Sequence, residues 1–363
     1  MGGPQVATSR LVSKLVERGV RVVVVAPCSS CATEAMTQLE DGAALVTVPA
    51  STRWTLARGL QPWRKHARAV VERVGADVVH GQGLLAGGIA AVDMKGRPTV
   101  VTARGSVRAD TAGAYGGAGR IARTYLGNRI ASAAIERADV VIGVNPDWRI
   151  NLPQRPKRFV YIPNMIDEFF FGRRREPERG LVFFAGGTRA IKGWTLLAQA
   201  WPRVRAAIPD ARLNVIGWPP AQTPPGISPR DRESLVVEGW LSSTELAERM
   251  VRASALVIPS QFEVSPIVLA EAWALGLPVV AVPVGGIPAL ATGAVVLVER
   301  EPEALAAGMV AALMGGEDID RLVAEGRRRA EAHRADAVAE AHLALYHELV
   351  HEAELTSASS PSA

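Results

Sequence analysis

The sequence predicts an α/β protein made of two Rossmann-like, doubly wound domains, and three observations lead to this fold class. The chain has 363 residues, which is too long for one small core and fits two domains of ordinary size. Short runs rich in Val, Ile and Leu alternate with amphipathic stretches, as expected for parallel sheets that helices cover on both faces. These runs form two sets, separated by a charged segment that contains Pro and Gly.

The first set predicts an N-terminal domain over residues 1–165. Its apolar runs are of strand length, and most are followed by a stretch with helical periodicity. The predicted strands are residues 20–26, 44–49, 77–80, 99–103, 139–144 and 159–163.

The second set predicts a C-terminal domain over residues 181–334, joined to the first by a linker at 166–180, where the sequence changes from apolar to highly charged. Residues 335–352 have a helical pattern, and 353–363 are expected to form a disordered tail. The predicted strands of the second domain are 181–186, 212–217, 235–239, 255–260, 278–282 and 295–299.

Composition indicates a soluble globular protein, with 48% hydrophobic and 21% charged residues. Its apolar runs are shorter than the roughly 20 residues that span a bilayer, and its first residues lack the apolar segment of a signal peptide. We therefore expect a cytoplasmic location.

Charge is distributed unevenly along the chain. Residues 1–170 contain 22 Lys and Arg and 13 Asp and Glu, a net charge of +9, whereas the remainder has a net charge of −4. A basic first half can attract lipid head groups, phosphorylated acceptors or nucleic acid, or it can simply be a solvated basic surface. Nucleic acid is not expected, because the sequence has no zinc-finger spacing, RNP sequence or basic zipper.

Metal and redox chemistry find little support in the sequence. Cys28 and Cys31 are the only cysteines, too few for a zinc site, and two reduced thiols are a simpler interpretation than a redox pair. Residues 318–320 read Asp-Ile-Asp but open a predicted helix, where acidic residues favour the dipole. We expect neither a bound metal nor a cofactor.

The most informative segment is "SQFEVSPIVLAEAWALG", residues 260–276. Its apolar stretch is a predicted helix with Ser265 as N-cap, Pro266 at the first position and Gly276 as C-cap. Because the helix follows a parallel strand, its amino end faces the carboxyl edge of the sheet and can bind phosphate.

Two carboxylates accompany this predicted helix. Glu263 lies in the loop before it, and Glu271 lies among its apolar residues. A buried carboxylate needs hydrogen-bond donors, which a ribose could supply to Glu271 and a transferred hexose to Glu263. The alternative is that Glu271 points to solvent or accepts from a backbone amide.

A second strand–loop–helix segment carries a cation. In "FFAGGTRAIKGW", Lys192 lies where the glycine loop meets the helix, a position from which it can neutralise a diphosphate. The segment is not a Walker A loop, because Gly193 follows the lysine instead of a hydroxyl residue. The glycine turn "VGGIP" at 284–288 is by itself a weak signal.

Together with "YIPNMID" and "VEGWLSSTEL", these segments resemble the retaining glycosyltransferase family four, which has the GT-B fold of two Rossmann-like domains facing a cleft. The resemblance is strongest over residues 160–300. It implies that the C-terminal domain binds a nucleotide-diphosphate sugar and that residues 335–352 return to pack on the N-terminal domain. It implies these donor-binding residues: Gly187, Lys192, Glu263, Ser265, Pro266, Ile267, Val268 and Glu271.

The chain also departs from the family pattern. Gly187 stands where the family has an arginine, and Arg189 is the expected substitute. Pro266 stands where a glycine is common and offers no N–H to a phosphate. Ala289 replaces a glutamate in the glycine turn.

In the N-terminal domain the resemblance implies an acceptor or phosphate loop at Gly2, Gly3 and Asn145, although capping of a short helix is a simpler role for Asn145. Residues 111–120 are expected to be a mobile loop near the acceptor. The family has a central strand before the glycine pair, so the first strand is expected to be missing through truncation. The resemblance implies these catalytic candidates: Glu263, Lys192, Arg189, His80 and Arg104.

The reaction implied is transfer of a glycosyl group to an acceptor hydroxyl with retention of configuration, in glycan, glycolipid or cell-envelope polysaccharide synthesis. The basic first domain favours a lipid-linked or otherwise anionic acceptor and peripheral contact with the cytoplasmic membrane face. Two alternatives stay open: a nucleotide-sugar-binding protein with impaired catalysis, and a relative of nucleotide-sugar epimerases.

Overall fold

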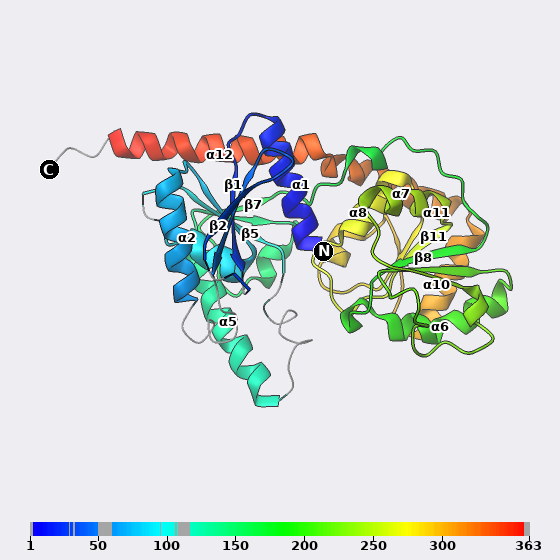
Figure 1. The fold of residues 1–363 in the computed structure, drawn as a ribbon. Helices are drawn as coiled ribbons and strands as arrows, with labels where there is room; N and C mark the ends of the chain where they lie inside the picture. Colours follow the sequence, from blue (N-terminus) through cyan, green and yellow to red (C-terminus); the bar gives the residue numbers. More distant parts are fainter. Residues whose placement is uncertain are drawn as a thin grey trace. The chain divides into compact units, whose positions relative to one another are not determined.

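The computed structural model describes residues 3–28, 30–31, 33–49, 60–94, 96–105, 107 and 117–358. The chain divides into two compact units. Unit 1 consists of Met1–Asn164 together with Ala335–Ala363, and unit 2 consists of Met165–Arg334. Each unit contains parallel β-structure with helices packed on it, so the predicted α/β class is confirmed (Figure 1).

Unit 2 is built on one six-stranded parallel sheet with the order β10-β9-β8-β11-β12-β13. All six strands lie within or close to the predicted runs, because each is a short apolar segment. The four inner strands have a neighbour on both sides and are mostly buried, whereas β10 and β13 form the edges. The strands are β8 (Leu181–Ala185), β9 (Arg212–Ile216), β10 (Leu235–Glu238), β11 (Ala255–Ile258), β12 (Val279–Ala281) and β13 (Val296–Leu297).

Helices cover both faces of this sheet. Successive residues of β8 alternate between them: Phe183 belongs to the core under α7 and α8, whereas Val182 and Phe184 belong to the core under α6 and α10. The helices of unit 2 are α6 (Trp194–Ala207), α7 (Ser243–Arg252), α8 (Ile267–Leu275), α9 (Ile287–Ala291), α10 (Pro302–Met314) and α11 (Glu317–Ala330), with 3-10 turns η3 (Glu168–Phe170), η4 (Ala190–Lys192), η5 (Arg232–Ser234) and η6 (Glu331–His333).

The part of unit 1 that the structure describes has two separate sheets instead of one. A three-stranded sheet has the order β1-β3-β2, and a four-stranded parallel sheet has the order β4-β5-β6-β7. Strand β2 is antiparallel to β3 and fully exposed, and the sequence did not predict it. The strands are β1 (Val23–Cys28), β2 (Ala35–Gln38), β3 (Ala44–Pro49), β4 (Val79–Gln82), β5 (Thr99–Ala103), β6 (Val140–Gly143) and β7 (Phe159–Tyr161).

The helices of unit 1 include a long C-terminal helix, α12, which packs against α1 (Figure 1). It continues to Ala358, so the predicted start of a disordered tail at residue 353 is wrong. The helices are α1 (Gly3–Glu17), α2 (Gln61–Val74), α3 (Gly88–Ala91), α5 (Gly117–Arg137) and α12 (Ala335–Ala358), with a π-helical turn η1 (Gly83–Gly87) and a 3-10 turn η2 (Trp148–Asn151).

The predicted linker at 166–180 is part of unit 2. Ile166 and Phe170 are fully buried in the core that includes α7 and α8. The Ile166 N–H also donates to the carbonyl of His333 at 2.9 Å. The start of the predicted linker is therefore packed in the core of unit 2, and the charged residues that suggested a linker come after it.

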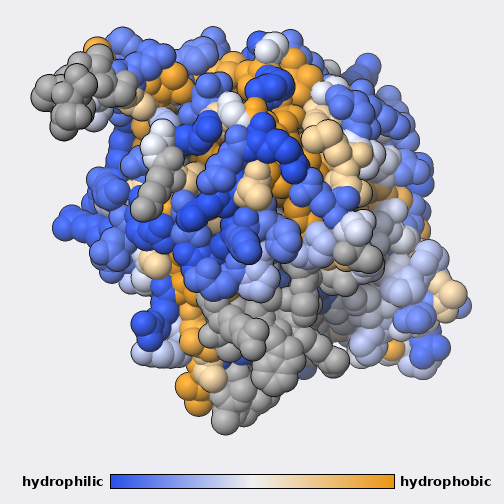
Figure 2. Space-filling view, turned by 60° about the vertical axis from the view of Figure 1, so that its left-hand side comes forward, coloured by the Kyte–Doolittle hydropathy of each residue, from blue (hydrophilic) through white to orange (hydrophobic). Residues whose placement is uncertain are grey.

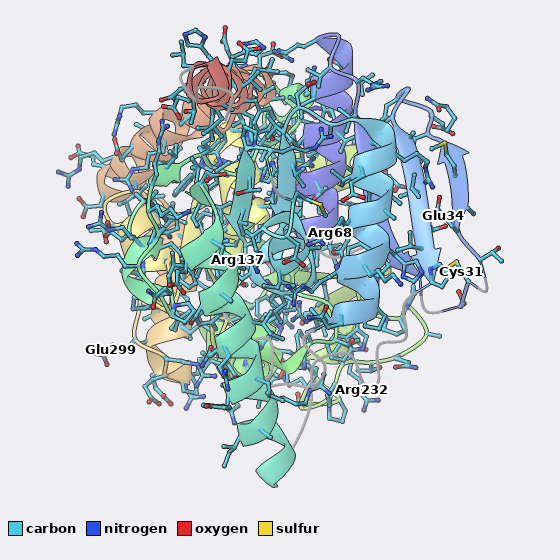
Figure 3. All side chains as sticks on the ribbon, turned by 90° about the vertical axis from the view of Figure 1, so that its left-hand side faces the viewer. Cys31, Glu34, Arg68, Arg137, Arg232 and Glu299 are labelled. Atoms are coloured by element: carbon cyan, nitrogen blue, oxygen red, sulfur yellow. A yellow bond between two sulfur atoms is a disulfide. The ribbon has the colours of Figure 1, made fainter. Side chains whose placement is uncertain are left out.

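A cluster of charges joins the helices of unit 1. The Asp93 carboxylate is only 5% exposed and forms ion pairs with Arg64 on α2 and Arg137 on α5. Arg68 on α2 donates to the Asp93 carbonyl at 2.9 Å, and Figure 3 shows Arg68 and Arg137 on their two helices. Burial opposes ionisation of Asp93, but the two guanidinium groups outweigh it and hold its pKa below the usual value. Part of the positive charge in the first half of the chain thus has a structural role.

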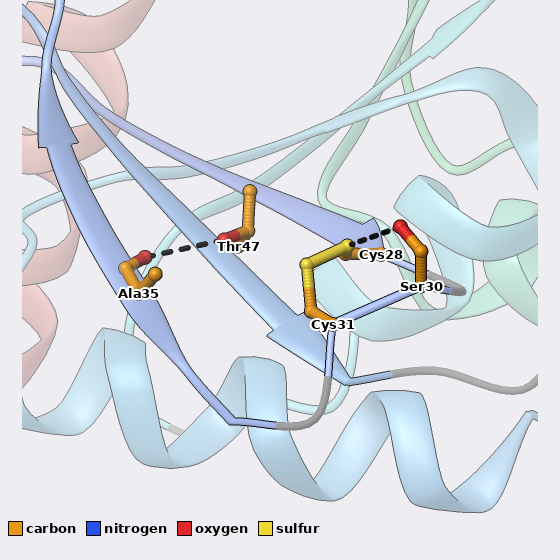
Figure 4. The surroundings of a disulfide bond; sticks show 5 residues. All are labelled: Cys28, Ser30, Cys31, Ala35 and Thr47. Carbon is orange, nitrogen blue, oxygen red and sulfur yellow. Dashed lines mark hydrogen bonds between the residues drawn. A yellow bond between two sulfur atoms is a disulfide. The ribbon is translucent and has the colours of Figure 1, made fainter.

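Cys28 and Cys31 form a disulfide at the carboxyl end of β1 (Figure 4). The expectation of two reduced thiols is therefore wrong. The Ser30 hydroxyl lies 3.6 Å from the Cys28 Sγ.

The face of the molecule seen in Figure 2 is mostly hydrophilic, with hydrophobic residues in smaller patches. Large hydrophobic side chains that remain exposed include Ile121 and Tyr125 on α5. Among the helices in the described ranges, none combines the length and the apolar character that a bilayer span requires.

Candidate functional site

Lys192 and Glu263 meet in unit 2, at the carboxyl ends of neighbouring parallel strands. Lys192 ends the turn η4 after β8, and Glu263 lies in the loop after β11. The Lys192 Nζ donates to Glu263 Oε1 at 2.7 Å, and the Ser260 hydroxyl donates to the same oxygen at 2.7 Å. Both residues line a small cavity of about 20 Å³, together with Gly186 and Val268. Two residues 71 positions apart thus form one partly buried ion pair at the sheet edge.

Two glycines make this approach possible. Gly193 has φ +82°, and a Cβ there would lie 1.8 Å from the carbonyl oxygen of Pro259. Gly285 has φ +57°, and its Cβ would lie 2.1 Å from the carbonyl oxygen of Glu263. The Gly286 N–H donates to that same carbonyl at 2.7 Å. The glycine turn at 284–288, a weak signal in the sequence, therefore holds the backbone of the Glu263 loop.

The amino end of α8 lies beside the ion pair, since Val268 lines the same cavity. The helix begins at Ile267 with Pro266 as N-cap, one residue later than predicted, and no side-chain cap bond is made. The assignment of Ser265 as N-cap is therefore wrong. The N–H groups of Ile267 and Val268 have no carbonyl partner within the helix, so they can bind an anion.

Glu271 is buried in α8, with 3% of its surface exposed, so the alternative in which it points to solvent is excluded. It lies four residues after Ile267 and three after Val268, so its side chain is on the same side of the helix as theirs. It is not among the residues that line the small cavity.

The glycine loop after β8 adds a residue that the sequence reasoning missed. The Gly187 N–H donates to the Ile216 carbonyl at 3.1 Å, and a Cβ at Gly187 would lie 3.2 Å from the Trp240 ring. Trp240 is 69% exposed, which is unusual for so large an apolar side chain. The signal was present in the sequence, because this tryptophan lies two residues after the end of β10, at the same sheet edge. Arg189 is exposed, and within the described ranges no ion pair joins it to Glu263.

In unit 1, His80 belongs to a polar network that connects β4 with α12. Its Nδ1 lies 2.6 Å from the Tyr346 hydroxyl, and its Nε2 lies 2.6 Å from the Thr102 hydroxyl. Burial lowers the pKa of His80 well below 6.5, and the nearby His342 and Arg104 lower it further. The neutral imidazole is thus engaged at one nitrogen by Tyr346 of α12 and at the other by Thr102 of β5.

Arg104 follows β5 and joins this network. Its Nε donates to Gln82 Oε1 at 2.8 Å, and its Nη1 donates to Asn164 Oδ1. Burial lowers the pKa of Arg104 to about 10, so the guanidinium is still charged at neutral pH. The structure brings His80 and Arg104 together through Gln82, whose Nε2 lies 3.2 Å from the His80 Nε2.

The remaining candidates of unit 1 are at its termini and turns. Gly3 is the first residue of α1. Gly2 lies outside the described residues, and so do residues 111–116 of the predicted mobile loop. Asn145 is 1% exposed, and its Oδ1 accepts from the Asp147 N–H at 3.1 Å. Asn145 therefore closes the turn that leads into η2, close to the capping role that the sequence suggested.

Two Rossmann-like units, the second with a lysine, a glutamate and a helix amino end at its sheet edge, define a protein of the GT-B class. The family model described as Glycosyl transferases group 1 matches residues 179–314, and the model described as Glycosyltransferase Family 4 matches residues 1–168. The chain belongs to this family of glycosyltransferases.

Two curated relatives share part of the chain. A sulfoquinovosyl transferase from Arabidopsis thaliana is 34% identical over 119 residues, 31% of this chain and 21% of the relative. A D-inositol 3-phosphate glycosyltransferase from Segniliparus rotundus is 30% identical over 181 residues, 47% of this chain and 40% of the relative. The matches thus cover less than half of the length of either relative.

Solved structures share the fold over nearly the whole chain. The sucrose-phosphate synthase from Thermosynechococcus elongatus has a TM-score of 0.78 and 20% identity, covering 96% of this chain and 94% of its own. The Anabaena protein HepE, solved in complex with UDP and glucose, has a TM-score of 0.69 and 14% identity, covering 95% of each chain.

Proposed function

We propose that this protein transfers a glycosyl group from a nucleotide-diphosphate sugar to an acceptor hydroxyl, with the anomeric configuration retained. The observation that carries the proposal is the Lys192–Glu263 ion pair beside the amino end of α8. A cation and two helix N–H groups suit a diphosphate, and a carboxylate next to them suits sugar hydroxyls. Family membership and the UDP-bound relative structure support the same donor class.

Each residue of the pair has a separate role in this proposal. Lys192 turns from Glu263 toward the diphosphate when the donor binds, because a dianionic group attracts it more strongly than one carboxylate. Both described contacts to the Glu263 side chain end on Oε1, which leaves Oε2 for a hydroxyl of the transferred sugar. Glu271 accepts a hydrogen bond from a ribose hydroxyl, as the family resemblance implies. For this contact the ribose has to lie below the first turn of α8.

The main requirement of the transfer step is that the leaving diphosphate is stabilised. A covalent nucleophile on the protein is not needed. The bond from the anomeric carbon to the phosphate oxygen breaks, and the acceptor oxygen forms a bond to the same face of that carbon. The acceptor proton goes to the leaving phosphate oxygen. Lys192 and the N–H groups of Ile267 and Val268 stabilise the charge that develops there.

The exposed Trp240 fits the nucleobase of the donor. It lies over Gly187 and Gly217, whose small size leaves room for a flat ring at the sheet edge. An aromatic ring can stack on a base of any identity.

We infer that the acceptor is anionic, lipid-linked or phosphorylated, and that the protein works in the cytoplasm with peripheral membrane contact. The net charge of +9 over residues 1–170 supports this, as does a curated relative that is named for inositol 3-phosphate.

Calorimetric titration with UDP, GDP and ADP, followed by release of free sugar from the matching nucleotide sugar, tests the donor proposal. Lys192→Ala and Glu263→Gln are each expected to lower the sugar-release rate at least a hundredfold, a typical cost of removing transition-state contacts. The exposed residues Lys157 and Glu299 provide the matched controls Lys157→Ala and Glu299→Gln.

The pattern of losses separates the possible functions. Binding of a nucleotide without any sugar release would indicate a binding protein and contradict catalysis. Full turnover in Lys192→Ala and Glu263→Gln would contradict the site. Trp240→Ala is expected to weaken nucleotide binding about tenfold, in line with the loss of one stacking contact.

A further inference from the structure

The disulfide between Cys28 and Cys31 joins the only two cysteines of the chain within a single turn. It lies at the carboxyl end of β1, and its two cysteines are three positions apart (Figure 4). A cross-link stabilises a protein mainly by restricting the unfolded chain, and this effect is smallest for the shortest rings. Because both cysteines belong to the same turn, the bond also attaches no distant element of unit 1 to β1. A purely structural role therefore explains it poorly.

Both cysteines are accessible to a reactant in solution. Cys28 and Cys31 are partly exposed, and Ser30 between them is exposed. Thiol–disulfide exchange requires an attacking thiolate to reach one sulfur of the bond, and partial exposure permits this. The sequence offers no third cysteine as an alternative partner. The chain therefore has two defined states, one with this disulfide and one with two thiols.

The Ser30 hydroxyl makes the two sulfur atoms unequal. It lies 3.6 Å from the Cys28 Sγ, and since a disulfide sulfur has no proton, the hydroxyl is the donor. Among the described residues no hydrogen bond reaches the Cys31 Sγ. A hydrogen bond to sulfur favours the thiolate, and exchange is faster when the leaving sulfur is the more stable thiolate. Attack is therefore expected at Cys31, with Cys28 as the leaving group.

The strand that follows this turn is weakly held. Strand β2 is exposed along its whole length, and in the described part of the chain it pairs with β3 alone. The Thr47 hydroxyl donates to the Ala35 carbonyl at 3.4 Å (Figure 4). Arg73 and Glu34 form an ion pair that is partly exposed, and such pairs contribute little to stability. Because β3 lies between β1 and β2, the turn with the disulfide leads the chain across the end of β3.

We propose that Cys28 and Cys31 form a thiol–disulfide exchange site whose oxidation state controls how firmly β2 is attached to β3. The bond restricts the turn that places β2, and β2 has almost no burial of its own to replace that restriction. This site goes beyond the proposed glycosyl transfer and does not depend on it.

The co-reactant of this site is a dithiol. One thiolate of the dithiol attacks the Cys31 Sγ, the bond between Cys28 and Cys31 breaks, and Cys28 leaves as a thiolate that takes up a proton. The second thiol of the co-reactant then attacks its own sulfur in the mixed disulfide, and Cys31 is released as a thiol. The chain gains two electrons and two protons, and the dithiol is oxidised to a disulfide.

The first experiment compares the rate at which dithiothreitol reduces the native chain with the rate for the chain unfolded in urea. Alkylation of the thiols followed by mass spectrometry measures both rates. The native rate is expected to lie within about tenfold of the unfolded rate, because the sulfurs are accessible. A lower native rate would show that the fold shields the bond and would contradict an exchange site. Oxidised glutathione is expected to restore the bond in the reduced native chain, and failure to do so would contradict the proposal as well.

The second experiment measures amide hydrogen exchange in the oxidised and the reduced chain. Reduction is expected to speed exchange in β2 about tenfold or more and to leave β5 unchanged. The double variant Cys28→Ser, Cys31→Ser is expected to show the pattern of the reduced chain with and without dithiothreitol. Unchanged exchange in β2 would overturn the control of this strand. Equal acceleration in β2 and β5 would show that the bond is a structural cross-link of unit 1 as a whole.

A third measurement tests the role of Ser30. Ser30→Ala is expected to slow reduction of the native chain about threefold or more, because the Cys28 thiolate loses its hydrogen-bond donor. Thr33→Ala removes an exposed hydroxyl from the same connection and is the matched control. Equal reduction rates in Ser30→Ala and the parent chain would contradict Cys28 as the leaving group. None of these measurements uses nucleotide binding or sugar release, so their outcome is independent of the proposed transfer reaction.

Discussion

The two units have the same pattern of strands and helices in the sequence but different sheets. In unit 2, β8 and β11 lie in the middle of one six-stranded sheet and are almost completely buried. In unit 1, β1 is richer in valine than β8 or β11 but only partly buried, and the described strands form two sheets. Local composition thus specifies a strand, whereas its burial and its ladder depend on which neighbours are present.

The difference extends to what holds each unit together. The centre of unit 2 is secured by its sheet, and its glycine loops can approach one another closely at the sheet edge. Unit 1 relies more on its helices: Asp93 connects α2 and α5 through ion pairs, and the His80–Tyr346 contact attaches α12 to β4. Substitutions at these places test the comparison.

The largest effect is expected from Gly193→Ala in unit 2. The φ of +82° and a Cβ 1.8 Å from the Pro259 carbonyl would force β11 and the η4 turn apart. We expect a loss of about 4 kcal/mol of unfolding free energy and loss of nucleotide binding, measured by denaturant unfolding and calorimetry.

Gly315→Ala is the matched control for this substitution. Gly315 has a similar φ of +73°, but a Cβ there would meet nothing within 4 Å. Its cost is the intrinsic cost of the left-handed region, about 1 kcal/mol. Equal losses of unfolding free energy in the two variants would show that the close approach of Gly193 to the Pro259 carbonyl does not matter for stability. The η4 turn and the end of β11 could then move apart without cost.

In unit 1, Asp93→Asn is expected to cost about 3 kcal/mol, because it leaves two arginines around a buried site without their anion. Denaturant unfolding of the 363-residue chain, monitored on unit 1 by hydrogen exchange, measures the loss. Asp147→Asn, at an exposed carboxylate, is the control. A loss below about 1 kcal/mol would mean that the helices of unit 1 do not depend on this cluster.

A smaller effect is expected for the backbone amides of β1 and β8. Those of β1 should exchange about a hundredfold faster than those of β8, because among the described residues β1 pairs on one edge and β8 on both. Mass spectrometry of deuterated fragments measures this in a single sample, with β5 as an internal reference within unit 1. Equal rates in β1 and β8 would remove the physical basis of the comparison.

Most of the fold could be predicted from the sequence, because a parallel strand buried on both faces has a near-continuous apolar run. All twelve predicted strands are present with modest shifts at their ends. Strand β2 could not be found in this way, since Ala35–Gln38 is exposed and pairs at an antiparallel edge, where no apolar run is required.

The candidate site could be predicted where its residues directly follow the ends of predicted strands. Lys192 and Glu263 both follow strands of one sheet, so their meeting could be anticipated, although the 2.7 Å contact depends on Gly193 and Gly285. The disulfide between Cys28 and Cys31 and the contact of His80 with Tyr346 could not be predicted. The first depends on the turn after β1, and the second joins residues 266 positions apart.

The smallest effect concerns pH and the helix α12. His342 is buried on this helix beside His80 and Tyr346, and burial lowers its pKa to about 4, with a further lowering by Arg104 opposed by the Val338 carbonyl. The folded state therefore holds a neutral imidazole at a pH where the unfolded chain, with its ordinary pKa near 6.5, already binds a proton. This contribution to stability is complete above pH 6.5 and decreases as the pH falls toward 4.

We therefore expect unit 1 to lose up to about 2 kcal/mol between pH 6.5 and pH 5 from His342 alone, at about 1.4 kcal/mol per pH unit and proton. His342→Leu should flatten this pH dependence of unfolding free energy, whatever its effect at neutral pH, whereas His351→Leu at an exposed position of the same helix should not. Unit 2 in the same samples provides the internal reference. An unchanged slope in His342→Leu would mean that α12 releases this histidine to water before unit 1 unfolds, so that unit 1 would be held by its ion pairs and not by its C-terminal helix.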